Sequence, residues 1–412
     1  MVRSAQATTQ PVVPTGKELE NLLSPVSISD FLENYADRKA LLIKGKSEKF
    51  AQLKFDKEAF FSSCNRFGNV SDRLKVALRM EEGEHENYEA IFPFQARNLF
   101  ENGMTICCAG ISDANETLAA FSEGVRLSLC VPDLRFNSYL SPHDSGFNLH
   151  YDVQAIFLMQ TQGKKNWWYS KEPISPAPTV YSSKLKNKLS IDELETCVLE
   201  PGDVLYLPAF SWHRARADNM SLGITLGIKG LHNQPLRDAV DASPFSGDWP
   251  YQVSQPQLDA RAVPVEGTPA AVTPYLQQQL KDFQAYVDNL TEADLWSAWI
   301  REVNQPKGPV LPAHPVNLMR NNSLKRSKLF PVNLLPTTLE DGSRGIEVLH
   351  ACHRAVFPEA NTDLLRFLLA YEEVFIAGDV PKLAGLPEST AWLDYEGVLR
   401  RLATMRVLEK IR

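Results

Sequence analysis

The sequence predicts an α+β protein: a mainly β core built as a sandwich or barrel, then helices, then a small winged-helix module. Short β-rich runs separated by Gly, Pro, Ser and Asp fill residues 125–229. Helical periodicity begins after them at Thr273, and residues 331–412 have the pattern of three helices and a terminal strand. A chain of 412 residues has room for two or three such units.

The N-terminal elements can be placed first. Ser27, three residues before Asp30, is a helix-start signal, and the apolar run "ALLIKG" that follows indicates a strand. Five runs then have strand composition, with no long helical period between them. They are "VRLSLCV", "DVQAIFLMQTQ", "NWWYS", "DVLYLPA" and "SLGITLGI".

The C-terminal half is predicted to be helical. A linker rich in Pro, Ser, Gly and Asp covers residues 232–272, and Thr291 with Asp294 starts a second helix after the first one. The first helix has apolar residues at spacings of three and four, namely Leu276, Leu280, Phe283, Val287 and Leu290. This apolar seam suits a partner helix and predicts a homodimer. The alternative is that it packs on its own chain, covered by Trp296 and Trp299.

Composition excludes several classes of protein. The net charge of −7 argues against a general nucleic-acid binder. No run of eighteen apolar residues exists, so we expect no membrane span, and the N-terminus lacks the apolar core of a secretory signal. The six cysteines form no C-x-x-C pair, which is typical of reduced thiols in a cytoplasmic protein.

One motif carries chemistry. His150 and Asp152 are two residues apart, so on a strand both side chains point to the same side. The run "EPGDVLYLPAFSWH" supplies a turn, a strand and then His213, which can return beside the first histidine. Two histidines and one carboxylate hold Fe(II) and leave positions open for a co-substrate and O2. Zinc is the competing metal, although its structural sites are usually rich in cysteine.

A cation lies at a suitable place to complete this site. Lys165 follows Gly163, which we predict to be a turn that leads into the next strand. From there a long ammonium side chain can reach back to the far carboxylate of 2-oxoglutarate that chelates the metal through its keto acid end. The pattern therefore predicts a metal triad with 2-oxoglutarate as co-substrate.

"NLHYDVQAIFLMQTQGKKNW" together with "EPGDVLYLPAFSWH" resembles the JmjC-type cupin fold, a double-stranded β-helix, of Fe(II)/2-oxoglutarate oxygenases. Within that family the chain is similar to the ribosomal oxygenases, which are histidyl and arginyl hydroxylases. The resemblance assigns the metal to His150, Asp152 and His213, and 2-oxoglutarate to Lys165. "NSYLSP" resembles a family strand whose Asn and Tyr help to hold 2-oxoglutarate, which implies that role for Asn137 and Tyr139.

The resemblance also implies a division of the chain. Residues 1–18 would be a disordered tail, 19–235 the catalytic domain, 236–330 a linker with a helical dimerisation region, and 331–412 a winged-helix-like domain. The segment "HDSGFN" departs from the Gly- and Pro-rich approach that the family has before the first histidine. Both a ribosomal protein and the precursor peptide of a natural product therefore stay open as substrates.

Three functions fit these residues. The first is a dioxygenase that hydroxylates an amino-acid side chain in a protein or peptide. The second, N-methyl-lysine demethylation, uses the same metal site. The third is a non-catalytic cupin and winged-helix protein that only binds a partner; an intact triad and the lack of a basic recognition helix argue against it.

Overall fold

The computed structural model describes residues 12–67, 72–77, 88–175, 189–228, 273–387 and 389–411. The chain divides into two compact units. One unit comprises residues 1–230 together with 303–412, and the other comprises residues 231–302. The predicted linker at 232–272 lies outside the described residues.

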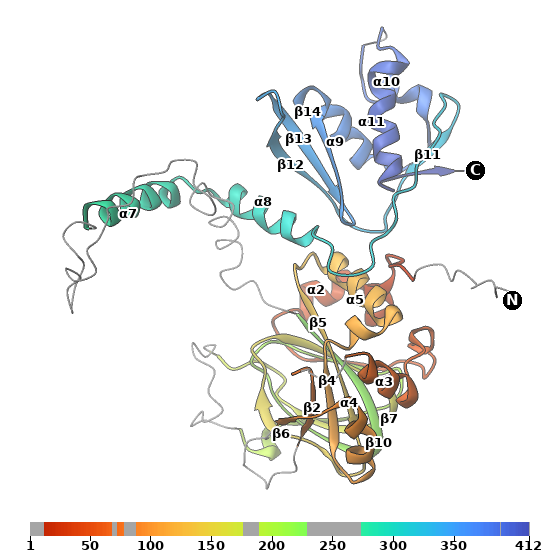
Figure 1. Ribbon diagram of the computed structural model, residues 1–412. Coiled ribbons are helices and arrows are strands. Elements are labelled where there is room, and N and C mark those ends of the chain that lie inside the picture. The colour runs from red at the N-terminus through yellow and green to blue at the C-terminus, as the bar shows by residue number, and fades with distance from the viewer. Residues whose placement is uncertain are drawn as a thin grey trace, which may run out of the picture. The chain divides into compact units, whose positions relative to one another are not determined.

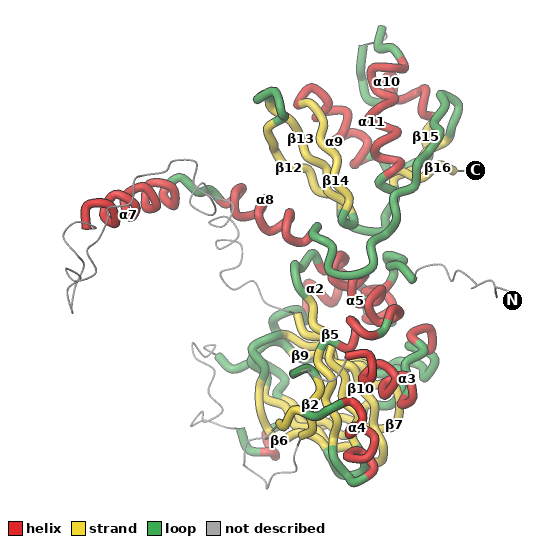
Figure 2. The backbone as a smooth tube through the Cα atoms, viewed as in Figure 1, coloured by secondary structure: helices red, strands yellow, loops and turns green. Residues whose placement is uncertain are grey.

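A 10-stranded antiparallel sheet forms the N-terminal core, which confirms the mainly β prediction (Figure 1). Its strands follow the order β1-β9-β7-β10-β5-β4-β2-β3, with β6 added on β10 and β8 on β7. The strands are β1 Leu41–Ile43, β2 Leu74–Ala77, β3 Tyr88–Ala90, β4 Thr105–Ala109, β5 Leu134–Ser141, β6 Gly146–Tyr151, β7 Ala155–Tyr169, β8 Glu195–Leu199, β9 Val204–Leu207 and β10 Trp212–Ile228. In Figure 2 these strands wrap around one another instead of lying flat.

Gly163 is not a turn between two strands, as the sequence predicted, but a bend inside the 15-residue strand β7. Its φ is +69°, and a Cβ at this position would lie 1.7 Å from the main-chain oxygen of Met220 on β10. The register of β7 against β10 shifts at this bend. Glycine therefore lets one strand curve without losing its partner.

Replacing Gly163 with alanine is expected to lower the free energy of unfolding by roughly 1–3 kcal/mol, because strain of the backbone and a clash with Met220 add together. Gly342 provides the control, since its φ is +82° but no atom lies within 4 Å of a Cβ there. Gly342→Ala should lower the free energy of unfolding by less than Gly163→Ala does. Urea unfolding measures both changes, and equal changes would show that the close approach to Met220 does not affect stability.

The run "VRLSLCV", predicted to be a strand, is instead the second half of helix α5 (Glu116–Leu129) and the residues after it. The side chain of Asn115 caps the helix start by accepting from the main-chain N–H groups of Thr117 and Leu118. Inside the helix, the guanidinium of Arg126 and the carboxylate of Glu123 form a fully buried ion pair. The strand prediction was wrong because a short apolar run has no period of its own.

Helices precede and interrupt the sheet. They are α1 Glu18–Leu23, α2 Ile28–Asn34, α3 Lys57–Cys64 and α4 Pro93–Glu101. The prediction at Ser27 is confirmed, because its side chain accepts from the N–H of Asp30 at the start of α2. The predicted tail extends too far, since Thr15 donates to the carboxylate of Glu18 in α1.

The C-terminal elements contain the predicted helices and terminal strand, together with a sheet that the sequence did not predict. The helices are α9 Thr362–Ala370, α10 Val380–Leu383 and α11 Trp392–Thr404. One three-stranded sheet joins β11 Ser323–Arg326 to β15 Phe375–Ile376 and β16 Leu408–Ile411, and the other joins β12 Val332–Thr338, β13 Arg344–His350 and β14 His353–Pro358. Because β11 pairs with β16, this module includes residues that come before 331.

His350 lies at the end of β13 and is fully buried. Its pKa is lowered to about 4, mainly by burial, with a contribution from the nearby His353 and Arg326, while the main-chain oxygen of Pro331 opposes the shift. The imidazole is therefore neutral in the folded protein at neutral pH.

Because the pKa of His350 is lower in the folded chain than the ordinary 6.5, the unfolded chain binds more protons between pH 6.5 and about 4. The free energy of unfolding should fall across that window as the pH falls, by up to about 3 kcal/mol from this group. His350→Gln should reduce the change in the free energy of unfolding with pH, and His143→Gln, at an exposed loop position, should not. Urea unfolding at several pH values measures this dependence, and the same dependence in both variants as in the wild type would contradict the prediction.

Residues 273–303 form two helices, as predicted, α7 Thr273–Asp288 and α8 Glu292–Val303. The start of α8 has the predicted signal, since the carboxylate of Asp294 accepts from both the N–H and the hydroxyl of Thr291. Along the seam of α7, Leu280 is 68% exposed and Phe283 is 38% exposed. In the described part of the chain, no helix has the length and hydropathy that crossing a membrane requires.

Candidate metal centre

Two histidines face each other across a pair of strands. His150 lies near the end of β6 and His213 near the start of β10, and the two are directly opposed in the antiparallel register. Their ring centroids are 4.2 Å apart. Asp152 follows β6 by one residue, and one potential ligand atom from each of the three residues lies within 4.8 Å of the others. The structure therefore brings the predicted triad together.

Hydrogen bonds orient both imidazoles in the same way. Nδ1 of His150 lies 2.7 Å from the main-chain oxygen of Asn148, and Nδ1 of His213 lies 2.9 Å from that of Ser211. A carbonyl oxygen can only accept a hydrogen bond, so each Nδ1 carries the proton and each Nε2 keeps a lone pair. Nε2 of His213 lies 3.6 Å from the carboxylate of Asp152. This tautomer is the one that a metal ligand needs.

Burial supports the same protonation state at His213. This side chain is buried, and its pKa is lowered to about 4. The loss of solvation is the main cause, the neighbouring His150 adds to it, and Asp152 opposes it. A neutral imidazole at neutral pH can bind a cation without first losing a proton.

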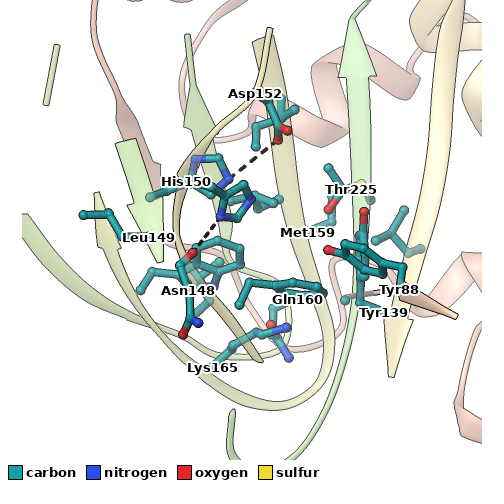
Figure 3. A pocket seen from close by; sticks show the side chains of 18 residues that line it. Tyr88, Tyr139, Asn148, Leu149, His150, Asp152, Met159, Gln160, Lys165 and Thr225 are labelled. Atoms are coloured by element: carbon teal, nitrogen blue, oxygen red, sulfur yellow. Dashed lines mark hydrogen bonds and ion pairs between the residues drawn. The ribbon is translucent and has the colours of Figure 1, made fainter. Parts of the chain in front are cut away.

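A cavity of about 290 Å³ opens beside the triad, a volume near the lower end for small-molecule sites. Figure 3 shows His150 and Asp152 at one end and Lys165 away from them. The other lining residues are mostly apolar or aromatic. They are Tyr88, Tyr139, Phe147, Asn148, Leu149, Ile156, Leu158, Met159, Gln160, Trp167, Leu199, His213, Gly223, Ile224 and Thr225.

Lys165 is 3% exposed and lines this cavity from the second half of β7. Its Nζ lies 3.3 Å from Oγ of Ser141, 5.3 Å from the centroid of the Phe147 ring and 5.7 Å from that of Trp167. Lys164 points to the opposite side, where its ammonium pairs with the carboxylate of Glu200 at 2.5 Å. An ammonium in such a low-dielectric pocket attracts an anion much more strongly than one in water.

Of the two residues predicted on β5, Tyr139 lines the cavity and Asn137 does not. The amide oxygen of Asn137 accepts from the main-chain N–H of Gly110 at 3.2 Å. Sequence reasoning missed Gln160 and Thr225, which also line the cavity. No local sequence signal identifies Thr225, which becomes a candidate only because the structure makes it the register partner of Asn137 on the neighbouring strand.

Part of the ten-stranded sheet and the helix before it match a known protein family. Residues 122–236 match the family model described as JmjC domain. Among curated proteins, the chain is 26% identical over 237 residues to "Uncharacterized protein YxbC" of Bacillus subtilis, an alignment that covers 52% of this chain and 72% of that protein.

Two further relatives carry functional names. One is "Bifunctional lysine-specific demethylase and histidyl-hydroxylase NO66" of Aedes aegypti, which is 26% identical over 50% of this chain and 34% of that protein. The other is "Ribosomal oxygenase 1" of Bos taurus, which is 27% identical over 52% of this chain and 32% of that protein. The chain thus spans about a third of the length of these two relatives. It carries a JmjC domain with a cupin-type β core, and it is related to the JmjC proteins named as ribosomal oxygenases.

Proposed function

We propose that the protein is an Fe(II)- and 2-oxoglutarate-dependent dioxygenase that hydroxylates an amino-acid side chain in a protein or peptide. The observation that carries this proposal is the convergence of His150, Asp152 and His213 at one end of a cavity that also contains the buried Lys165. A metal triad and an anion-binding cation in one enclosed space are what a chelating dicarboxylate requires.

The donor set fits Fe(II). Two imidazoles with free Nε2 lone pairs and one carboxylate form the facial set typical of non-haem iron oxygenases, and this set leaves positions open. When bound, iron with 2-oxoglutarate and O2 supplies the oxidation, in which 2-oxoglutarate becomes succinate and CO2 and one oxygen atom enters a C–H bond. The described residues around the triad include no cysteine ligand, which favours iron over a structural zinc.

The chain's own residues bind and orient the reactants. We propose that Lys165 pairs with the far carboxylate of 2-oxoglutarate and that Tyr139 contacts the same co-substrate from β5. Asn137 would act less directly, by holding the loop at Gly110 beside that strand. The apolar lining contributed by Ile156, Leu158 and other residues excludes water from the reacting C–H bond.

Demethylation of N-methyl-lysine is a second candidate, and the specific observation in its favour is the name of the Aedes aegypti relative, which includes both activities. Both reactions begin with oxygen insertion at a carbon, so the triad does not distinguish them. A non-catalytic binding role has less support, because it would not require the ordered tautomers of His150 and His213.

The substrate class remains a protein or peptide, and we infer that either a ribosomal protein or a natural-product precursor peptide is the target. We further propose the four-part division predicted from sequence, with the tail ending before residue 15 and the C-terminal module beginning at β11, a winged-helix-like role for that module, and a cytoplasmic location. None of the six cysteines, all of which lie among the described residues, forms a disulfide bond, which supports a reducing compartment.

We also propose a homodimer formed through α7. Leu280 and Phe283 are exposed on the seam, and Val287 is half-buried. An apolar stripe of this spacing stabilises a helix pair when the same face meets itself about a two-fold axis.

Replacing Leu280 and Val287 with aspartate should therefore give a monomer, measured by light scattering at micromolar concentration. The matched control is Gln278→Asp with Ala285→Asp, which adds the same two charges on the other face of α7 and should leave the dimer intact. A monomeric wild-type protein would show that the seam does not mediate dimerisation.

The test of the proposed function is 2-oxoglutarate turnover by the purified protein. With Fe(II), O2 and 2-oxoglutarate, the protein should produce succinate, and Zn(II) in place of Fe(II) should give none. Equal background production with either metal would contradict the proposal.

A further inference from the structure

The cavity is too small for a polypeptide. A volume of about 290 Å³ holds a small dicarboxylate and one side chain, so the rest of a protein or peptide substrate must lie outside. Tyr88 is one lining residue that is also well exposed, at 44%. Its ring stacks on Phe147 with centroids 6.3 Å apart, and Phe147 lies beside His150. Tyr88 therefore marks a place where the cavity meets the surface.

Tyr88 belongs to β3, which ends the path of the ten-stranded sheet and, among the described strands, pairs only with β2. All three residues of β3 are exposed. The N–H of Ile91 donates to the oxygen of Leu74 on β2. Since hydrogen-bonded and non-hydrogen-bonded pairs alternate in an antiparallel ladder, the N–H and C=O of Ala90 point away from β2. An edge of this kind is a template for another extended chain.

Two phenylalanines follow directly along the chain. Phe92 is 47% exposed and Phe94 is 75% exposed, and their rings stack with centroids 5.6 Å apart and planes 10° from parallel. Phe92 itself has extended backbone angles before α4 begins. Stacked aromatic rings left on a surface are a suitable contact for an apolar or aromatic side chain of a partner.

We propose that residues 88–94 are the docking strip for the substrate, an extended polypeptide segment that pairs with the edge of β3. This inference rests on the proposed function, because it takes the oxidised side chain to enter the cavity beside Tyr88. An extended chain rises about 3.3 Å per residue, so the step from Tyr88 to Phe92 spans about 13 Å. The strip therefore selects an apolar or aromatic residue about four positions from the residue that is oxidised.

The test uses peptide retention without turnover. Full-length protein with Fe(II) and 2-oxoglutarate, kept free of O2, is incubated with a peptide mixture from digested host-cell protein, and retained peptides are quantified by mass spectrometry. Ala90→Pro removes the outward N–H while the pairing with β2 stays possible, and Ala90→Val keeps that N–H. Phe94→Ser removes the exposed ring, and Leu393→Ser, at another exposed apolar position on α11, is its control.

Ala90→Pro and Phe94→Ser should each reduce retention by about tenfold, which corresponds to about 1.4 kcal/mol, and their controls should not. Retained peptides should carry an apolar or aromatic residue about four positions from the site that gains oxygen once air is admitted. Equal retention by all variants, or no retention by the wild type, overturns the docking strip. Oxygen gain that is insensitive to Ala90→Pro overturns only this inference, whereas Ala90-dependent retention without oxygen gain overturns only the proposed hydroxylation.

Discussion

Succinate production is expected to disappear in Asp152→Ala and, separately, in His213→Ala. Each residue supplies one of the three protein ligands that the structure brings within 4.8 Å, and loss of one leaves too few donors to retain Fe(II) at micromolar concentration. A succinate assay and the iron content after gel filtration measure the two consequences together.

His143→Ala is the matched control for the triad variants. His143 lies on an exposed loop, where its Nδ1 contacts the main-chain oxygen of Asp218, and it should be dispensable for turnover. Unfolding curves should show that Asp152→Ala retains the fold, because its side chain is 45% exposed. Full turnover by both triad variants would contradict the assignment of Asp152 and His213 as metal ligands.

Lys165→Ala is expected to raise the KM for 2-oxoglutarate by about ten- to a hundredfold. In the proposed complex the ammonium would face the far carboxylate of 2-oxoglutarate in a pocket lined by Phe147 and Trp167, where a charge-assisted hydrogen bond contributes roughly 1.5–3 kcal/mol. At about 1.4 kcal/mol per decade, this loss gives the expected range. Initial rates of succinate formation at varied 2-oxoglutarate measure it.

Lys164→Ala controls for the loss of a positive charge on the same strand. Lys164 is about half exposed and pairs with Glu200 on the outer side, so its replacement should leave the KM unchanged. Lys165→Arg should recover part of the affinity because it restores the charge. An unchanged KM in Lys165→Ala would show that a group other than Lys165 binds the far carboxylate of 2-oxoglutarate.

The triad and its cation could be predicted because their signals are local. His150 and Asp152 are two residues apart, which is the spacing of side chains on one face of a strand. The Pro201-Gly202-Asp203 turn and the apolar run after it predict the strand before His213. The structure adds the pairing of β6 with β10, which sets the two histidines opposite each other. That pairing joins residues more than sixty positions apart, and no short pattern specifies it.

Other features were hidden for identifiable reasons. The run from Val125 to Val131 is apolar without a period, and the capping residue Asn115 that reveals the helix lies ten residues earlier. Gly163 has the sequence signature of a turn, and only the close approach of Met220 shows that it bends one strand. The strands β12 to β14 were not predicted, because residues 331–412 were interpreted as three helices and one terminal strand. Lining residues such as Tyr88 come from a different part of the sheet, and nothing in their local sequence points to the metal.

The central claim is that this site inserts oxygen into a side chain of a protein or peptide. The most direct measurement is mass spectrometry of host peptide fractions after incubation with the protein, Fe(II), 2-oxoglutarate and isotopically labelled O2. We predict that one peptide gains a single labelled oxygen atom in step with succinate formation, and that Asp152→Ala gives no gain. Loss of a methyl group from lysine without retained oxygen would assign the site to demethylation, and the absence of any mass change despite succinate formation would contradict the claim for these substrates.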